Sequence, residues 1–189
     1  DSSPSRGLGD VYKRQTVYEK SAEIIRMLKT IIGKEKFLEG MNQFFKNQDG
    51  CACTLEDFQE AFEYVLDTNL DKFFKWFHEP GTPKLIVSEK YVGKNYKVTF
   101  RQEKPMKSGK YSNKVMPITY KILSSKGHFL QQKKTLVLDK KTSSIELKNQ
   151  NEKPAISVLN SFSAPVLVEF KQSIDDLFSI LEFETDFTS

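Results

Sequence analysis

The chain has 189 residues, of which 38% are hydrophobic and 29% charged, and its formal net charge at pH 7 is +4. This length suits one ordinary domain or two small ones. The mild positive excess is spread along the chain rather than gathered in a basic stripe, which argues against nucleic-acid binding. No stretch approaches the roughly 20 apolar residues that a membrane-spanning helix needs.

The first fifteen residues, D-S-S-P-S-R-G-L-G-D-V-Y-K-R-Q, are rich in serine, glycine and charge and show no periodicity. We interpret residues 1–15 as a non-native or disordered leader that lacks the apolar segment of a signal peptide. The folded chain is therefore expected to begin at about Thr16.

A helix is predicted from Thr16 onward. Thr16 and Glu19 have the spacing of a capping box, and Gly33 stands where a left-handed C-cap would end the helix. Tyr18 would lie near the helix start, ahead of the buried face. Its phenol is uncharged at pH 7 and can donate one hydrogen bond, although an isolated tyrosine most often has a packing role. The predicted buried face repeats at helical period and consists of Ile24, Met27, Leu28, Ile31 and Ile32.

Three further helices are predicted over residues 34–46, 54–65 and 70–77. Each carries aromatic or aliphatic residues on one face, and the turn residues that follow end each pattern. Because the chain offers no large layer to pack on them, we expect these phenylalanine-rich faces to be left partly uncovered. Pro80 and Pro83 stop helix formation.

After Pro83 the hydrophobic period changes from 3.6 to 2. About seven short strands with one polar face predict an antiparallel β-sandwich. From Gln172 the pattern is helical again. The apolar strand segments lie at residues 85–87, 96–100, 118–122, 136–138, 145–147, 156–159 and 166–170.

The residues that could hold a metal are few. Cys51 and Cys53 are one residue apart, which predicts free thiols and leaves a reducing compartment plausible. A structural zinc ion would want four ligands, and no further cluster completes a site. His78 is expected at a helix end, and His128 at an exposed hairpin tip.

Three segments resemble a known family. V-Y-E-K-S-A-E-I-I-R-M-L, residues 17–28, is similar to the segment of the aminopeptidase N family of zinc peptidases that carries the catalytic tyrosine, with Ser21 where the family usually has glycine. D-K-F-F-K-W-F-H-E-P-G-T-P, ending at Pro83, resembles the end of the family's catalytic domain. F-S-A-P-V, residues 162–166, resembles the end of the following sandwich in the bacterial alanyl branch. The resemblance covers residues 16–189.

The resemblance implies an α+β fold class with three parts. Residues 16–83 would be the C-terminal helical part of a thermolysin-like catalytic peptidase domain. Residues 84–171 would form an antiparallel immunoglobulin-like β-sandwich. Residues 172–189 would be the truncated start of a further, C-terminal helical domain.

The implied function is that of a zinc-dependent aminopeptidase that hydrolyses N-terminal residues from peptides. Tyr18 would be the catalytic residue of this chain, donating a hydrogen bond to the oxyanion that forms when zinc-bound water attacks the peptide bond. The chain lacks the H-E-x-x-H zinc motif, so the Zn²⁺ ligands are expected to lie outside it and the isolated chain to be inactive. The complete enzyme is expected to be a cytoplasmic monomer whose partners are peptide substrates, not nucleic acid or membrane.

Two alternatives stay open at this point. Some relatives of these peptidases keep the architecture as non-catalytic scaffolds or interaction modules, and the presence or absence of an upstream zinc motif would separate the two. A basic nucleic-acid binder would show binding that depends steeply on salt.

Overall fold

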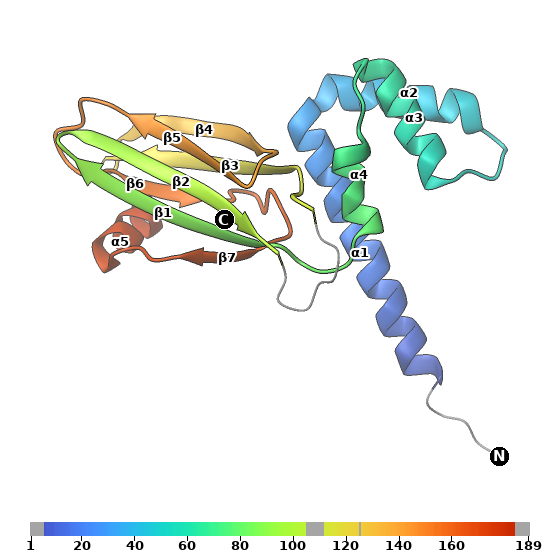
Figure 1. The fold of residues 1–189 in the computed structure, drawn as a ribbon, viewed down its shortest axis with the longest axis horizontal. Helices are drawn as coiled ribbons and strands as arrows, with labels where there is room; N and C mark the ends of the chain where they lie inside the picture. The colour runs from blue at the N-terminus through green and yellow to red at the C-terminus, as the bar shows by residue number, and fades with distance from the viewer. Residues whose placement is uncertain (1–5, 105–111, 125, 184–189) are drawn as a thin grey trace.

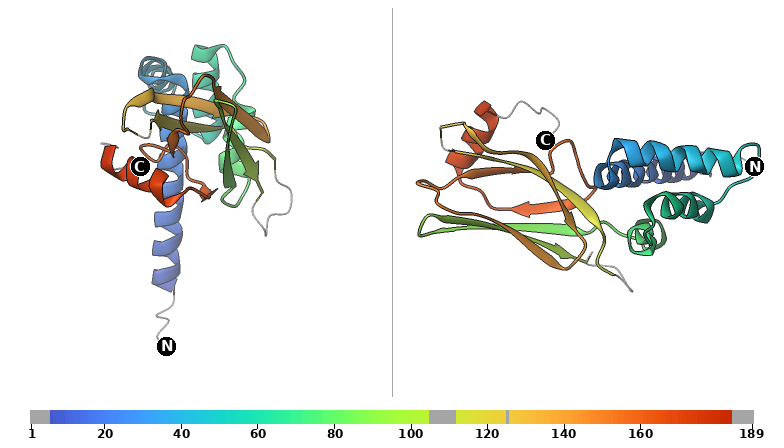
Figure 2. Two further views of the ribbon diagram at one scale, coloured as in Figure 1. Left: turned by 90° about the vertical axis from the view of Figure 1, so that its left-hand side faces the viewer. Right: turned by 90° about the horizontal axis from the view of Figure 1, so that it is seen from above.

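Among the residues that the structure describes, four helices lie beside one end of a two-sheet β-sandwich and a fifth lies near its opposite end (Figures 1 and 2). The computed structural model describes residues 6–104, 112–124 and 126–183. The arrangement confirms the α+β class and the sandwich. None of the described helices is long and apolar enough to cross a membrane.

The first helix, α1, runs over Arg6–Ile32. It therefore begins well before Thr16, and both the capping box at Thr16 and the disorder predicted for residues 6–15 are wrong. Thr16 lies inside the helix, where backbone N–H groups bond to the preceding turn and need no cap. Residues 1–5 of the predicted leader lie outside the described residues, and the non-native origin of the leader stays a prediction.

The predicted buried face of α1 is confirmed. Ile24, Met27 and Leu28 are almost fully buried, while Ile31 and Ile32 pack against the same core. The helix ends before Gly33, whose φ of 84° is in the left-handed region that glycine enters without strain.

The next three helices follow the sequence pattern closely. They are α2 (Lys34–Gln48), α3 (Leu55–Leu66) and α4 (Asp71–His78). The capping box of α3 is present, because the Asp57 N–H donates to the Thr54 hydroxyl and the Thr54 N–H donates to the Asp57 carboxylate.

The expectation that the aromatic faces of these helices are left partly uncovered is confirmed for α2, where Leu38 and Phe45 are 50% and 56% exposed, but it is wrong for the faces that enter the core. Phe62, Phe73 and Phe74 are at most 3% exposed, because the helices bury these faces against one another and in the common core. Phe58 lies at the centre, with its ring centroid 4.7 Å from that of Phe62 and 6.3 Å from that of Phe74. Aromatic contacts of this kind cover part of these faces.

The described part of the sandwich has seven strands. One sheet has the order β5-β2-β1-β7 and the other the order β4-β3-β6. All neighbours pair antiparallel except β1 and β7, which are parallel. The parallel pair arises because the chain crosses from β6 in one sheet to β7 at the edge of the other. The strands are β1 (Lys84–Val92), β2 (Asn95–Glu103), β3 (Met116–Leu123), β4 (Phe129–Leu138), β5 (Thr142–Leu147), β6 (Ala155–Val158) and β7 (Leu167–Phe170).

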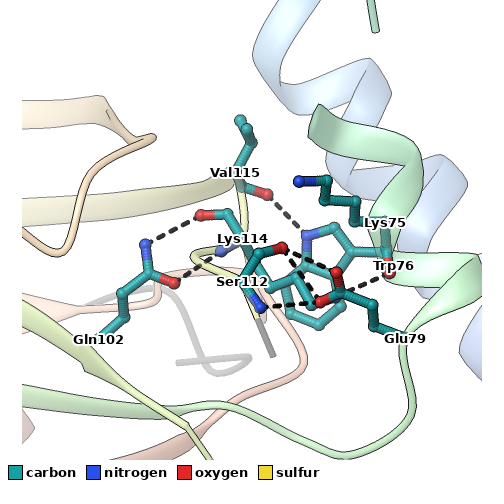
Figure 3. Close-up of polar contacts among 7 residues, drawn as sticks. All are labelled: Lys75, Trp76, Glu79, Gln102, Ser112, Lys114 and Val115. Carbon is teal, nitrogen blue, oxygen red and sulfur yellow. Dashed lines mark hydrogen bonds and ion pairs between the residues drawn. The ribbon is translucent and has the colours of Figure 1, made fainter. Parts of the chain in front are cut away.

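A buried polar cluster joins the helices to the sandwich (Figure 3). The Lys114 side chain is fully buried, and its Nζ lies 2.6 Å from Glu79 Oε2 and 2.7 Å from the Lys75 carbonyl oxygen. Ser112 donates to Glu79 from its N–H and its hydroxyl. The Trp76 indole N–H donates to the Val115 carbonyl at 2.7 Å. These contacts fix the end of α4 against the segment that leads into β3.

Opposing effects act on the two charges of this cluster. Burial raises the pKa of Glu79, but hydrogen bonds from Lys114 and Ser112, together with the Lys114 charge, outweigh it and hold the pKa at about 2. Burial lowers the pKa of the Lys114 ammonium, and its pairing with Glu79 opposes that shift. The pairing with Glu79 therefore offsets part of the cost of burying the Lys114 ammonium.

The last described helix, α5 (Ile174–Phe183), is held to the sandwich by a second charged cluster. Lys153 lies between Glu89 and Asp176, at 2.6 and 2.5 Å. Asp176 also accepts from the Ser173 hydroxyl, and its own N–H donates back to that hydroxyl. The helix predicted after Gln172 is thus confirmed.

Candidate functional site

Tyr18, the predicted catalytic residue, lies on α1 and its side chain is 72% exposed. Ile24, the first buried residue among the side chains of α1 that the structure describes, lies about 9 Å further along the axis. The ring is therefore not part of the hydrophobic core. This surface position leaves the phenol able to donate a hydrogen bond to a group that approaches α1.

An open groove of about 520 Å³ is lined by residues of α1 that follow Tyr18 in the sequence, although Tyr18 itself does not line it. One wall consists of α1, and the other is the β6–β7 loop, residues 159–166. Thr82, from the segment that follows α4, completes the lining. The lining residues on α1 are Glu19, Lys20, Glu23 and Arg26, and those on the loop are Phe162, Ala164, Pro165 and Val166.

Glu19 has a different place from the predicted one. The sequence predicts a capping role for it, but α1 begins at Arg6, so the N–H groups near Glu19 lie inside the helix. Glu19 instead lines the groove with Lys20. The charges on this wall are mixed, since Glu19 and Glu23 are acidic while Lys20 and Arg26 are basic.

Arg26 connects the two walls of the groove. Its guanidinium donates to the carbonyl oxygens of Ser161, at 3.2 Å, and of Phe162. It also pairs with Glu23, one turn earlier on α1. Two of the three segments that resemble the aminopeptidase N family, far apart in the sequence, are therefore in direct contact.

The β6–β7 loop has an unusual backbone. Leu159, Ser161 and Phe162 have φ values of 58°, 57° and 47°, and a non-glycine residue in this region costs of the order of 1–3 kcal/mol. Asn160 is fully buried, and its Oδ1 has no hydrogen-bond partner among the described residues. A loop with these costs persists only where surrounding contacts hold it.

The sandwich supplies part of that support. The Thr119 hydroxyl, on β3, donates to the Asn160 carbonyl, and the Thr119 N–H donates to the Ser163 hydroxyl at 3.1 Å. The Asn160 amide donates to the Ser157 hydroxyl at 2.7 Å. The loop is thus anchored to β3 and β6 on one side and to α1 on the other.

The described residues do not fit a zinc site. No group of three or more histidine, cysteine, aspartate or glutamate side chains in the described part of the chain could hold a metal ion. Cys51 and Cys53 are free and exposed. His78 ends α4, and His128 lies between β3 and β4, as predicted. That the zinc ligands lie outside the chain stays a prediction.

Two family models match the two parts of the molecule. Residues 3–77 match the peptidase family M1 domain. Residues 81–171 match a domain of unknown function with an Ig-like fold, DUF3458. The boundary between the two matches lies at the segment between α4 and β1.

Named relatives match most of the chain. Aminopeptidase N of Haemophilus influenzae is 32% identical over 179 residues, which are 89% of this chain and 21% of that protein. Aminopeptidase N of Escherichia coli is 32% identical over 182 residues, 86% of this chain and 20% of that protein. A crystal structure of Legionella pneumophila aminopeptidase A in complex with aspartic acid is 35% identical, with a TM-score of 0.81, over 90% of this chain and 20% of that one.

The helices and the sandwich together therefore correspond to two adjoining parts of the M1 family's architecture. The chain belongs to the aminopeptidase N family, as the segments around Tyr18, before Pro83 and at residues 162–166 indicate. It spans about a fifth of the length of the relatives that it matches.

The sequence alone did not predict the groove between α1 and the β6–β7 loop. It also did not predict that Arg26 connects the two walls of the groove. A signal was present, because Arg26 belongs to the same twelve-residue segment as Tyr18. Nothing in that segment indicates that its partners are backbone carbonyls of the β6–β7 loop.

Proposed function

We propose that this chain is part of a zinc-dependent aminopeptidase and supplies the tyrosine, Tyr18, that stabilises the transition state. The observation that carries the proposal is the position of Tyr18. It lies in the V-Y-E-K segment, within the residues that match the peptidase family M1 domain, and its ring is exposed. The aminopeptidase names of the relatives support the reaction class.

The chemistry assigned to Tyr18 follows from the phenol. Attack on a peptide carbonyl creates an oxyanion, and a neutral O–H donor held nearby stabilises the developing negative charge without adding a charge of its own. We expect the rest of the complete enzyme to hold the zinc ion, because the described residues do not fit a metal site. The proposed substrates are peptides with a free N-terminus.

Two further properties of the complete enzyme are its cellular compartment and its oligomeric state. We propose that it acts in the cytoplasm, which the two free, exposed cysteines support, since neither forms a disulfide. We also propose that it is a monomer, which light scattering of the complete enzyme would test.

The test is Tyr18→Phe in the complete enzyme. Removing one oxyanion donor costs about 10²–10³ in kcat, whereas the zinc content, measured by atomic absorption, should not change. Tyr64→Phe is the matched control, because Tyr64 on α3 is similarly exposed, at 76%, and lies away from the groove. An unchanged kcat in Tyr18→Phe would remove Tyr18 from the mechanism. A complete protein without stoichiometric zinc would instead favour a scaffold role.

A further inference from the structure

Arg26 makes a connection that neither the family resemblance nor the proposed mechanism uses. Its guanidinium lies between α1 and the β6–β7 loop and donates to two carbonyls, of Ser161 and Phe162, at sequence separations of 135 and 136 residues. The carboxylate of Glu23, one turn away on the same helix, holds the guanidinium in this orientation. Arginine suits this role because its planar fork presents several N–H donors in fixed directions.

The partner of Arg26 is firmly anchored to the sandwich. Thr119 of β3 bonds to both Asn160 and Ser163, and Asn160 is fully buried. Ser161 and Phe162, which Arg26 contacts, have left-handed backbone conformations that need support from neighbours. Arg26 therefore attaches α1 to a point that is fixed relative to β3.

The position of α1 in turn sets the position of Tyr18. Arg26 and Tyr18 are eight residues apart on one continuous helix, or about 12 Å along its axis. Ile24, Met27 and Leu28 bury one face of α1 in the core. The partly exposed Arg26 contacts the loop outside that core. The apolar face and the Arg26 contact hold α1 from two different directions. Together they restrict rotation of the helix about its axis more than the apolar face would alone.

We propose that Arg26 is a positioning residue for Tyr18. By tying α1 to the β6–β7 loop, it fixes the rotation of the helix and therefore the direction in which the phenol points. This inference rests on the proposed role of Tyr18 as the oxyanion donor. It assigns the sandwich domain a part in catalysis, because the loop that receives Arg26 belongs to the sandwich.

The first experiment replaces Arg26 in the complete enzyme. Arg26→Met should lower kcat by about ten- to a hundredfold, since a small misplacement of a catalytic group has effects of this size, while KM for the same peptide changes little. Arg26→Lys keeps the charge but loses the fork, so it should recover part of kcat. Lys133→Met is the matched control, because Lys133 contacts the Ser161 hydroxyl of the same loop from β4 rather than from α1, and it should keep kcat.

A double variant separates positioning from a general loss of structure. If Arg26 acts through the phenol, Arg26→Met should have almost no further effect on kcat when Tyr18 is already phenylalanine. If the two losses multiply instead, Arg26 acts independently of Tyr18 and the inference is overturned. Should Arg26→Met fail to fold, the same comparison is made with Arg26→Lys, and its two outcomes are interpreted in the same way.

The outcomes also separate this inference from the proposed function. A loss of kcat in Tyr18→Phe together with normal kcat in both Arg26 variants would overturn the inference and leave the function standing. A normal kcat in Tyr18→Phe would overturn both. Hydrogen exchange adds a readout that does not depend on activity, because Arg26→Met should speed exchange of the amides at residues 159–163. Unchanged exchange there would overturn the inference.

Discussion

At the scale of single residues, the most consequential side chain outside the groove is Lys114. A lysine is almost never fully buried unless it is paired, and Lys114 is buried because Glu79 and the Lys75 carbonyl accept from its ammonium. Gln102 completes the arrangement, since its side-chain amide donates to the Lys114 carbonyl at 2.9 Å and accepts from the Lys114 N–H at 2.8 Å. Changes to this cluster should therefore alter the free energy of unfolding.

We expect Glu79→Gln to lower the free energy of unfolding by about 3 kcal/mol, because it leaves the buried Lys114 charge without its counter-charge. Urea unfolding followed by circular dichroism measures the change. Glu146→Gln is the control, since Glu146 forms an exposed pair with Lys97 at 2.9 Å, and such pairs contribute about 0–1 kcal/mol. Equal effects of the two substitutions would contradict the importance of burial.

The same pair gives the stability a pH dependence of known sign. The pKa of Glu79 is about 2 in the folded protein, below its ordinary value of 4.5. A lowered carboxyl pKa contributes stability that is fully present above the unfolded pKa and is lost as the pH falls through the folded one. The difference between the original protein and Glu79→Gln should therefore shrink between pH 4.5 and pH 2. A constant difference over that range would show that the charge of Glu79 is not responsible.

At the scale of elements, α2 and α3 approach each other through a glycine. A Cβ atom at Gly40 would lie 2.5 Å from the ring of Phe62, and Phe62 is completely buried and cannot move aside easily. The close approach lets the aromatic face of α3 pack directly on the backbone of α2. Part of the aromatic faces of the two helices is thereby covered, although Phe45 of α2 stays 56% exposed.

We predict that Gly40→Ala destabilises the protein by about 1–3 kcal/mol, the usual cost of overpacking a core. The sign is informative, because glycine to alanine inside a helix otherwise stabilises by about 0.5–1 kcal/mol. Asn42→Ala on α2, away from Phe62, is the control and should leave stability unchanged or slightly raised. Thermal unfolding measures the Tm of both variants against that of the original protein. A Tm for Gly40→Ala above that of the original protein would refute the close packing.

At the scale of the whole molecule, the helices and the sandwich share one core. Buried residues of α1 and α4 belong to the same hydrophobic cluster as residues of the strands β1, β2 and β3. The polar cluster around Lys114 and the contact of Arg26 with the β6–β7 loop join the two parts at separate places. Two parts that match different family models are in this way built as one unit.

The single tryptophan of the sequence lies at the junction between the helices and the sandwich. Trp76 is the only tryptophan of the sequence, it is 1% exposed, and its indole N–H bonds to Val115 across the junction. We predict that tryptophan fluorescence and far-ultraviolet circular dichroism give coincident urea transitions, as expected for one cooperative unit. A fluorescence transition that ends before the circular dichroism changes would show that the junction opens first.

Local sequence patterns predicted most elements and the family. The 3.6 and 2 periods located the helices and strands, the Thr54 and Asp57 spacing predicted the α3 cap, and the segment around Tyr18 indicated the aminopeptidase N family. These signals are short-range, since each depends on residues within a turn or a strand of one another. That Tyr18 lies on a helix, ahead of its buried face, was accessible for the same reason. Its expected place near the helix start was wrong, because α1 begins at Arg6, and its catalytic role stays a proposal.

Only the tertiary structure decided the rest. The packing of Phe62 against Gly40, the burial of Lys114 and the contact of Arg26 with the β6–β7 loop have no local signature in the sequence. Each depends on groups that meet only after folding, across up to 136 residues in the case of Arg26. A sequence window records which faces are apolar, but which faces meet is settled by packing the whole chain around one core.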